Sequence, residues 1–274
     1  MLNKTEGNKL IYEKILSGEP FMAARFGATE IKAILYPSLP KILKIFLKKR
    51  ILRRMFTLSG FFPSTEENII KFSSLSTNDI NDLDILGSWR IEEFFYRNEL
   101  CNVNIVKLES LEPYLNNNPW SQLLKNKNVL VVHPFAETII EQYKKKDLLF
   151  SNKDILPDFN LDVIKAVQSL SGEKNSFDDW FQALDFMKNQ ISKKNFDIAL
   201  IGCGAYGFPL AAHVKRLGKQ AIHMGGSLQL LFGIKGRRWD NDPIIGKLYN
   251  ESWVRPRIED KPTYSKLVEN DCYW

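Results

Sequence analysis

The strongest chemical signal in the sequence is a glycine-rich turn. An apolar run, 196–201, leads directly into a Gly-x-Gly-x-x-Gly pattern, and an amphipathic stretch follows. In such a turn the glycines allow the tight bend, the approach of a phosphate and close helix–strand packing, while the helix N-terminus offers free N–H groups to an anion. A β–α turn without a ligand is the alternative. The residues expected to bind phosphate are Gly202, Gly204, Ala205, Tyr206 and Gly207.

The strand expected after this helix, 220–224, helps to identify the anion that the turn would bind. NAD sites usually place a carboxylate at the end of that strand to hold the ribose hydroxyls, and S-adenosylmethionine sites commonly do the same. No acid stands there; the strand ends with His223, and Gly225 and Gly226 follow. A second glycine turn would widen the backbone cradle to fit a diphosphate, whereas an ordinary loop is the alternative.

Three cations and an indole follow the second glycine turn: Lys235, Arg237, Arg238 and Trp239. Arginine forks match phosphate oxygens, and tryptophan stacks on a base or a sugar face. We expect the cations to bind the diphosphate and Trp239 to contact the substrate. The alternative is a solvated basic surface.

A charged pair follows the first apolar strand, 21–25. Arg25 closes this strand, where a charge is costly unless it meets a partner, Gly27 permits a turn, and Glu30 lies in the first turn of a helix. Open α/β sheets bind ligands at the carboxyl ends of their strands. We expect Arg25 and Glu30 to be catalytic and Gly27 to contact substrate, the alternative being an Arg–Glu pair that fixes the loop.

A histidine ends another apolar strand, 128–133. His133 lies where it could act as a base or a hydrogen-bond donor, and Glu137, four residues on, could contact substrate or favour a helix N-terminus. A satisfied structural histidine is the alternative. If an acceptor hydroxyl must lose its proton, Glu30, His133 and Asp158 are the candidate bases.

The elements that position these residues alternate between strands and helices along the chain. This alternation predicts an α/β fold: a Rossmann-like, mostly parallel sheet with helices on both faces. The strands are expected at 21–25, 84–88, 103–107, 128–133, 163–167, 198–202 and 220–224, and the helices at 8–16, 65–72, 137–145, 177–192 and 208–217. Without a linker rich in Pro, Gly or Ser, residues 1–274 are expected to form one domain, with a helical insertion at about 38–56 and a C-terminal tail at about 234–274.

Composition narrows the class of protein. The 274 residues are 44% hydrophobic and 26% charged, which is ordinary for a soluble protein. No apolar run approaches the roughly 18 residues of a membrane span, and no secretory signal opens the chain, so we expect a cytoplasmic protein. Three widely spaced cysteines and three histidines predict neither a disulfide framework nor a zinc site. A net charge of +6 suits a small anionic ligand or a membrane surface better than nucleic acid.

The insertion carries seven cations among apolar residues at helical spacing, within 41–54. Such a basic amphipathic helix predicts peripheral contact with anionic lipid, at the inner face of the membrane. A helix packed on the sheet with a solvated basic rim is the alternative.

Two segments resemble one family. The run Arg25-Phe-Gly-Ala-Thr-Glu30 is similar to the Arg-Phe/Tyr-Gly-Asp-Gly-Glu signature of the GT-D glycosyltransferases, and 197–226 resembles that family's strand, glycine turn, helix, strand and following glycine. The chain is also similar, nearly end to end, to uncharacterised proteins encoded in bacterial polysaccharide gene clusters. The recurring features are 131–135, 200–207, 231–236 and 272–274.

This resemblance implies a hexosyltransferase-like enzyme of bacterial surface polysaccharide (capsule) synthesis. The donor would be a nucleotide-diphosphate sugar, UDP-linked, and the acceptor a glycan or a lipid-linked glycan. A Rossmann-type enzyme that uses S-adenosylmethionine or NAD, and a non-catalytic nucleotide-sugar-binding protein, are the rivals.

The resemblance also implies a divalent metal, Mn²⁺ or Mg²⁺, on the family's acidic pair. Here Ala28 stands at the aspartate position, and Glu30 alone remains. Either Asp240, Asp242 or another acid completes the metal site, or the cations at 235–238 neutralise the diphosphate without metal.

Overall fold

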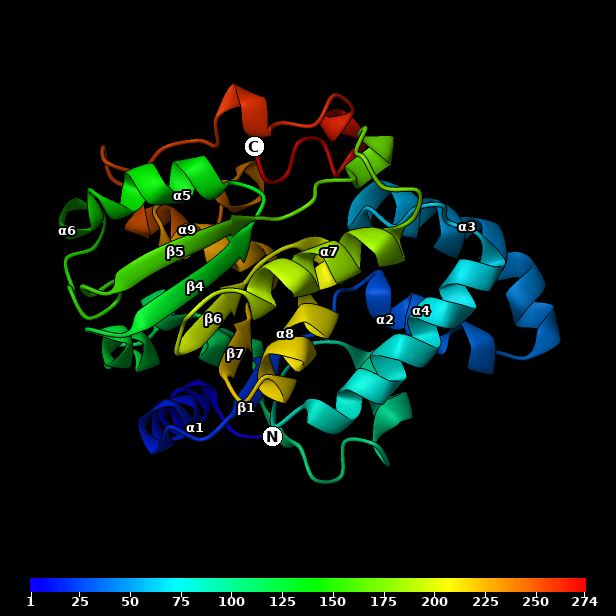
Figure 1. Cartoon of the computed structure of the whole chain (residues 1–274), viewed down its shortest axis with the longest axis horizontal. Coiled ribbons are helices and arrows are strands. Elements are labelled where there is room, and N and C mark those ends of the chain that lie inside the picture. The colour runs from blue at the N-terminus through cyan, green and yellow to red at the C-terminus, as the bar shows by residue number, and fades with distance from the viewer.

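A computed structural model describes all residues, 1–274, and contains one sheet of seven parallel strands (Figure 1). The strand order is β3-β2-β1-β7-β6-β4-β5. The fold expected from the sequence, an α/β sheet covered by helices, is confirmed. The strands are β1 (Phe21–Ala24), β2 (Ile85–Ser88), β3 (Asn104–Lys107), β4 (Asn128–His133), β5 (Asn160–Lys165), β6 (Ile198–Ile201) and β7 (Gln220–His223).

Six of the strands lie within one residue of their expected bounds, and β5 is shifted. It begins at Asn160, three residues before the expected start at 163, and pairs with β4 along its whole length. Because β5 is an edge strand with its polar start at the surface, the apolar pattern covers only its second half.

Two layers of helices cover the sheet, and each strand alternates between two apolar cores. Met22 and Ala24 face one core together with α2, α3, α4, α7 and α8, while Phe21 and Ala23 face the other with α1, α5 and α9. The helices are α1 (Lys4–Ser17), α2 (Glu30–Leu35), α3 (Lys41–Ser59), α4 (Glu66–Asp79), α5 (Ala136–Tyr143), α6 (Lys146–Leu149), α7 (Trp180–Ser192), α8 (Gly207–Arg216) and α9 (Leu228–Leu231).

The insertion and the tail have different structures. The insertion forms α3, which runs past the expected end of the insertion to Ser59, whereas the tail consists of short 3₁₀ turns and one isolated bridge, Ile234 to Val254. None of the helices is long and apolar enough to cross a lipid bilayer.

The direction of the crossovers opens a crevice between β4 and β6. From β4 the chain moves outward to β5, while from β6 it moves the other way to β7. Where neighbouring parallel strands lead away in opposite directions, the carboxyl ends leave room for a ligand. His133 and Gly202 stand at these two carboxyl ends.

Candidate functional site

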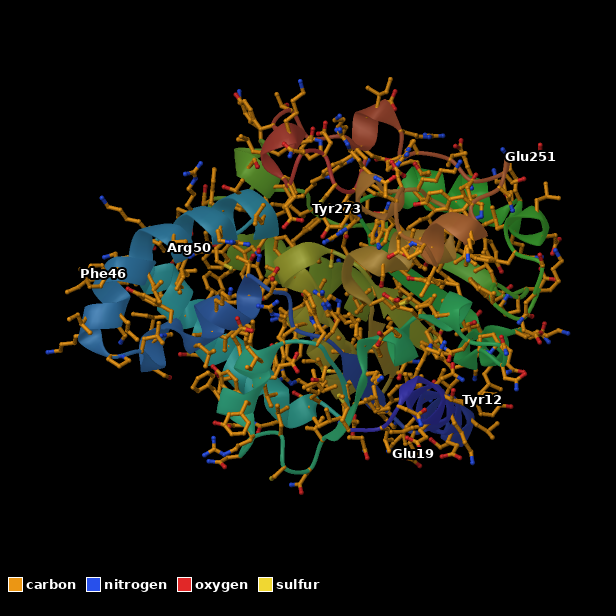
Figure 2. The ribbon with its side chains drawn as sticks, turned by 180° about the vertical axis from the view of Figure 1, so that it is seen from behind. Tyr12, Glu19, Phe46, Arg50, Glu251 and Tyr273 are labelled. Atoms are coloured by element: carbon orange, nitrogen blue, oxygen red, sulfur yellow. The ribbon has the colours of Figure 1, made fainter.

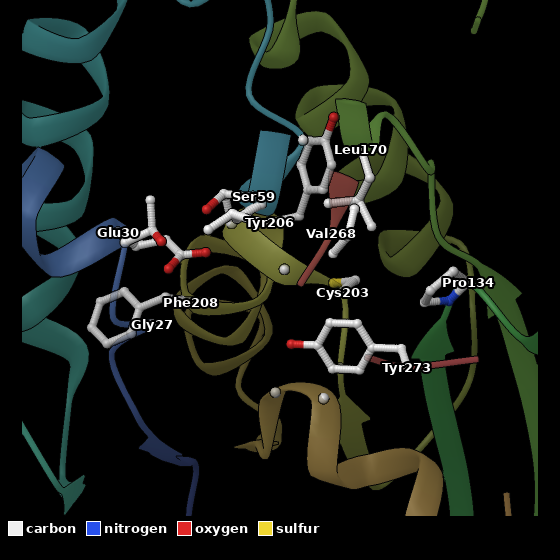
Figure 3. Close-up of a pocket in the computed structure, with 18 of the residues that line it drawn as sticks. Gly27, Glu30, Ser59, Pro134, Leu170, Cys203, Tyr206, Phe208, Val268 and Tyr273 are labelled. Carbon is white, nitrogen blue, oxygen red and sulfur yellow. The ribbon is translucent and has the colours of Figure 1, made fainter. Parts of the chain in front are cut away.

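A cavity lies at the carboxyl edge of the sheet (Figure 3). The segments after β1, β4, β6 and β7 all contribute to it, as do the end of α3 and the end of the chain. In Figure 3, Glu30 and Ser59 stand on one side, and the Tyr273 hydroxyl points into the space from the other. The residues expected from the sequence that line it are Arg25, Gly27, Glu30, His133, Gly202, Gly204, Ala205, Tyr206, His223, Gly225, Gly226 and Arg238.

The two glycine turns are packed against each other. A Cβ on Gly202 would lie 2.5 Å from the carbonyl oxygen of Gly225, and one on Gly207 would collide with the imidazole of His223. Gly204 adopts a left-handed φ of +57°. The turn therefore needs glycine for close packing at two positions and for backbone conformation at the third.

Tyr206 fixes the first turn to the core. Its ring stacks on Trp180 at a centroid distance of 4.9 Å, and its hydroxyl lies 3.0 Å from Ser169 Oγ, which donates to the carbonyl of Gly60. This arrangement holds the turn rigidly at the cavity wall.

Arg25 brings an unpaired positive charge to the cavity. Its guanidinium stacks over Trp89 at 4.7 Å but has no hydrogen-bond or ion-pair partner in the protein. Burial lowers its pKa, and the nearby Glu30 carboxylate opposes that shift; an arginine nevertheless stays protonated at neutral pH. A half-buried cation without a protein partner favours an anionic ligand.

Four further buried polar atoms on the cavity wall have no partner: Arg54 Nε, Ser59 Oγ, Ser76 Oγ and Gln229 Oε1. Buried polar groups are normally hydrogen-bonded, so such a cluster indicates a polar ligand or ordered water.

The two histidines of the cavity are held in different ways. His133 Nδ1 accepts the N–H of Phe135 at 3.0 Å, which leaves Nε2–H as a donor. The His223 Nδ1–H donates to the carbonyl of Ile201 at 3.2 Å, which leaves Nε2 as an acceptor. Burial lowers the pKa of each to about 3. Both rings are therefore neutral near pH 7, and the free nitrogen of His133 carries a proton that it can donate to a hydrogen bond.

Of the candidate bases, Glu30 is the carboxylate in the cavity. It opens α2, and its side chain folds back over Gly27, where a Cβ would collide with it. Asp158 pairs with Lys146 at 2.9 Å and does not line the cavity.

Several of the residues expected at the site do not line the cavity. Lys235 lies over the ring of Tyr249, Arg237 donates to the carbonyl of Asn270, and Glu137 pairs with Lys165 at 3.1 Å. Trp239 is also outside, although Arg238, which does line the cavity, stacks on it at 5.4 Å and donates to the Tyr273 hydroxyl at 2.9 Å.

The carboxylates do not form a donor set for a divalent cation. Glu30 and Glu269 are the acids of the cavity wall, with Ala28 at the position of the expected aspartate. Asp240 is paired with Arg255 at 2.8 Å, and Asp242 accepts the N–H groups of the turn that follows it. No three His, Cys, Asp or Glu side chains come together to hold a metal. A hard cation needs several oxygen ligands, so these residues do not fit it.

Arg54 was expected at a lipid surface, yet it lines the cavity. The buried positions of α3, Ile51, Met55 and Ser59, form a stripe at four-residue spacing, and Arg54 borders it. Helical periodicity within the basic stretch could have placed Arg54 on the inward side.

Two solved structures of one domain are similar to this chain at low sequence identity. No protein-family model matches the chain, and no curated protein matches it. One similar solved structure is described as the highly conserved domain of unknown function 1792, with a distinct glycosyltransferase fold; it has 13% identity and a TM-score of 0.44, over 82% of this chain and 77% of that chain. A selenomethionine-substituted structure of the same domain has 13% identity and a TM-score of 0.41, over 81% and 82%. These values are too low to assign the chain to that domain or to inform on its substrate.

Proposed function

We propose that this protein is a glycosyltransferase that moves a sugar from a nucleotide-diphosphate donor to a hydroxyl of a glycan acceptor. The observation that carries the proposal is Arg25, a half-buried cation without a protein partner, beside two glycine turns at the carboxyl edge of a parallel sheet. Fixed positive charge next to free backbone N–H groups is what a diphosphate requires.

In this proposal each residue has one task. The donor diphosphate lies between the glycine turns, and Arg25 neutralises the charge that develops as the bond from the sugar to the diphosphate breaks. The Nε2–H of His133 and the hydroxyl of Tyr273 donate hydrogen bonds to the nucleotide sugar. Glu30 accepts the proton of the acceptor hydroxyl as that oxygen attacks the anomeric carbon.

Calorimetry on wild type and variants tests the donor site. We expect UDP or GDP, with UDP the first choice, to bind at micromolar Kd, and Arg25→Ala to weaken this binding at least about tenfold, because a half-buried charged contact is lost. Arg237→Ala is the matched control, since Arg237 lies outside the cavity, and should bind like wild type. Binding of NAD or S-adenosylmethionine alone would refute the proposal.

A second candidate, a nucleotide-sugar-binding protein without turnover, is favoured by one observation: Ala28 stands where the family signature has an acid. Glu30→Gln separates the two candidates. The transferase loses release of nucleoside diphosphate from its donor in this variant, while donor binding stays within about threefold of wild type. A wild-type protein that binds but releases nothing with any acceptor supports the second candidate.

We further propose that the acceptor is reached at an anionic membrane surface, on the cytoplasmic side and through α3. Ile42, Ile45 and Phe46 of this helix are 63%, 76% and 73% exposed, among cations that suit anionic lipid. In the view of Figure 2, Phe46 lies at the outer end of the helix, away from the sheet.

A further inference from the structure

A second, open cleft adjoins the cavity, between α3 and the C-terminal segment. We call it the basic cleft; its residues are Lys49, Arg50, Arg53, Arg54, Thr57, Leu58, Leu267 and Glu269. It shares Arg54, Leu58 and Glu269 with the wall of the cavity, so the two spaces lie side by side along these residues.

The cations of the basic cleft are not neutralised by the protein. None of the four forms an ion pair, whereas Lys48, on another side of the same helix, pairs with Glu66. Helix α3 contains no aspartate or glutamate. Their positions on the helix (49, 50, 53 and 54) bring like charges together at four-residue spacing, which destabilises a helix unless an anion lies between them.

Two other features of the basic cleft leave its positive charge in excess. Glu269, its one acid, is shared with Arg238 at 3.6 Å. Arg54 has a buried Nε without a partner, at the boundary between cleft and cavity. An excess of positive charge and an unsatisfied donor therefore meet at one place.

We propose that the basic cleft binds a phosphate or diphosphate group carried by the acceptor. The ligand chemistry follows from the side chains, because guanidinium forks bind phosphate oxygens in pairs and lysine adds a point charge. The position follows from the shared wall: a phosphate held along α3 beside the cavity would direct the adjacent hydroxyl of the acceptor toward Glu30, opposite the diphosphate of the donor. The acceptor side of this assignment rests on the proposed function, whereas the anion site itself does not.

Pyrophosphate binding, measured by calorimetry, tests the site. We expect Arg50→Gln/Arg53→Gln to weaken one class of pyrophosphate sites about tenfold, since two charged contacts are lost. Both side chains are exposed and unpaired, so folding should not change. Lys144→Gln/Lys145→Gln removes the same charge from exposed positions after α5, on the opposite side of the molecule in Figure 1, and should leave binding unchanged. Equal weakening in this control, or none in the first variant, would overturn the proposal.

Two further arms separate this proposal from the donor site and from a lipid surface. Arg25→Ala should retain this class of pyrophosphate sites, and saturating UDP should not displace it; complete displacement by UDP would overturn the acceptor assignment. Vesicles with and without phosphatidylglycerol identify the source of the phosphate. If the arginine variant loses vesicle binding but keeps pyrophosphate binding, the basic cleft is a lipid contact only, and the proposal is wrong. If it loses both, the phosphate of a lipid-linked group occupies the cleft.

Discussion

The two histidines at the carboxyl edge of the sheet show how burial sets the protonation state of a side chain. His133 and His223 both line the cavity, yet each uses its Nδ1 within the protein, and burial lowers the pKa of both to about 3. The position of His133 at a strand end can be predicted from the sequence. Its neutral state, and the fact that Nε2 is the nitrogen left free, cannot be predicted, because they depend on the backbone N–H of Phe135 and on the surrounding core.

We therefore predict that His133 stays neutral, with the proton on Nε2, from pH 5 to pH 8. Nitrogen-15 NMR of the imidazoles would report this tautomer, and His213, half-exposed on α8 with its Nε2 2.9 Å from Ser192 Oγ, serves as an internal comparison. A His133 titration near pH 6.5 would contradict the prediction. The lowered pKa of the two buried rings also affects stability. Because a histidine in the unfolded chain takes a proton near pH 6.5, each buried ring lowers the free energy of unfolding as the pH falls from 6.5 toward 3.

Gly207→Ala should destabilise the protein, because its Cβ would displace the His223 ring. Overpacking of this kind costs about 1–3 kcal/mol, which a lower Tm would show. Gly246→Ala is the matched control, since its Cβ would meet atoms at ordinary contact distances of 3.5 Å and 4.0 Å. Equal Tm values for the two variants would contradict the close packing of the glycine turn.

At the level of elements, strands were easier to predict than turns. Buried strands such as β4 carry an unbroken apolar run, so their bounds follow from the sequence, while the edge strand β5 begins with polar residues. The structure of the tail is harder to predict, because nothing in the pattern of 235–242 shows which side chains face the cavity. Arg238 lines the cavity, and its neighbours Arg237 and Trp239 do not.

Helix α3 combines two environments, and its exposed half gives a prediction. Ile45→Ser/Phe46→Ser should weaken co-sedimentation with phosphatidylglycerol vesicles several-fold, because two large apolar side chains no longer enter the lipid. Phe94→Ser/Phe95→Ser alters another exposed apolar pair, 64% and 68% exposed, outside this helix, and should bind vesicles like wild type. Unchanged binding of the first variant would exclude α3 as the lipid contact.

On the scale of the whole molecule, the site joins residues from both ends of the chain. Arg25, Arg54, His133, Gly202 and Tyr273 surround one cavity. The strand types could be predicted from local patterns, but the strand order could not, since it depends on which long-range pairs form. The contribution of the tail to the cavity wall is likewise a property of the assembled fold.

One partly buried acid, Glu112, makes the stability of the whole fold depend on pH. Burial raises the pKa of Glu112 to about 7, against 4.5 for its usual value, so the folded state loses stability as the pH rises from 4.5 to 7. Glu112→Gln should therefore raise the free energy of unfolding at pH 8 by an amount on the order of 2 kcal/mol, seen as a higher Tm, and leave both unchanged at pH 4. A variant with lower Tm at pH 8 would show that the charged carboxylate is stabilising instead.

The central place of β1 has a consequence for folding during synthesis. This strand is the first of the seven to be made, and it pairs on one side with β2 and on the other with β7, at Phe21↔Gln220. Its second edge therefore stays open until all seven strands have left the ribosome, because β7 is the last strand to be made. Such high contact order slows folding and exposes an apolar edge meanwhile. We expect nascent chains that stop before residue 220 to be protease-sensitive and prone to aggregation, and chains that include β7 to become resistant in a single late step.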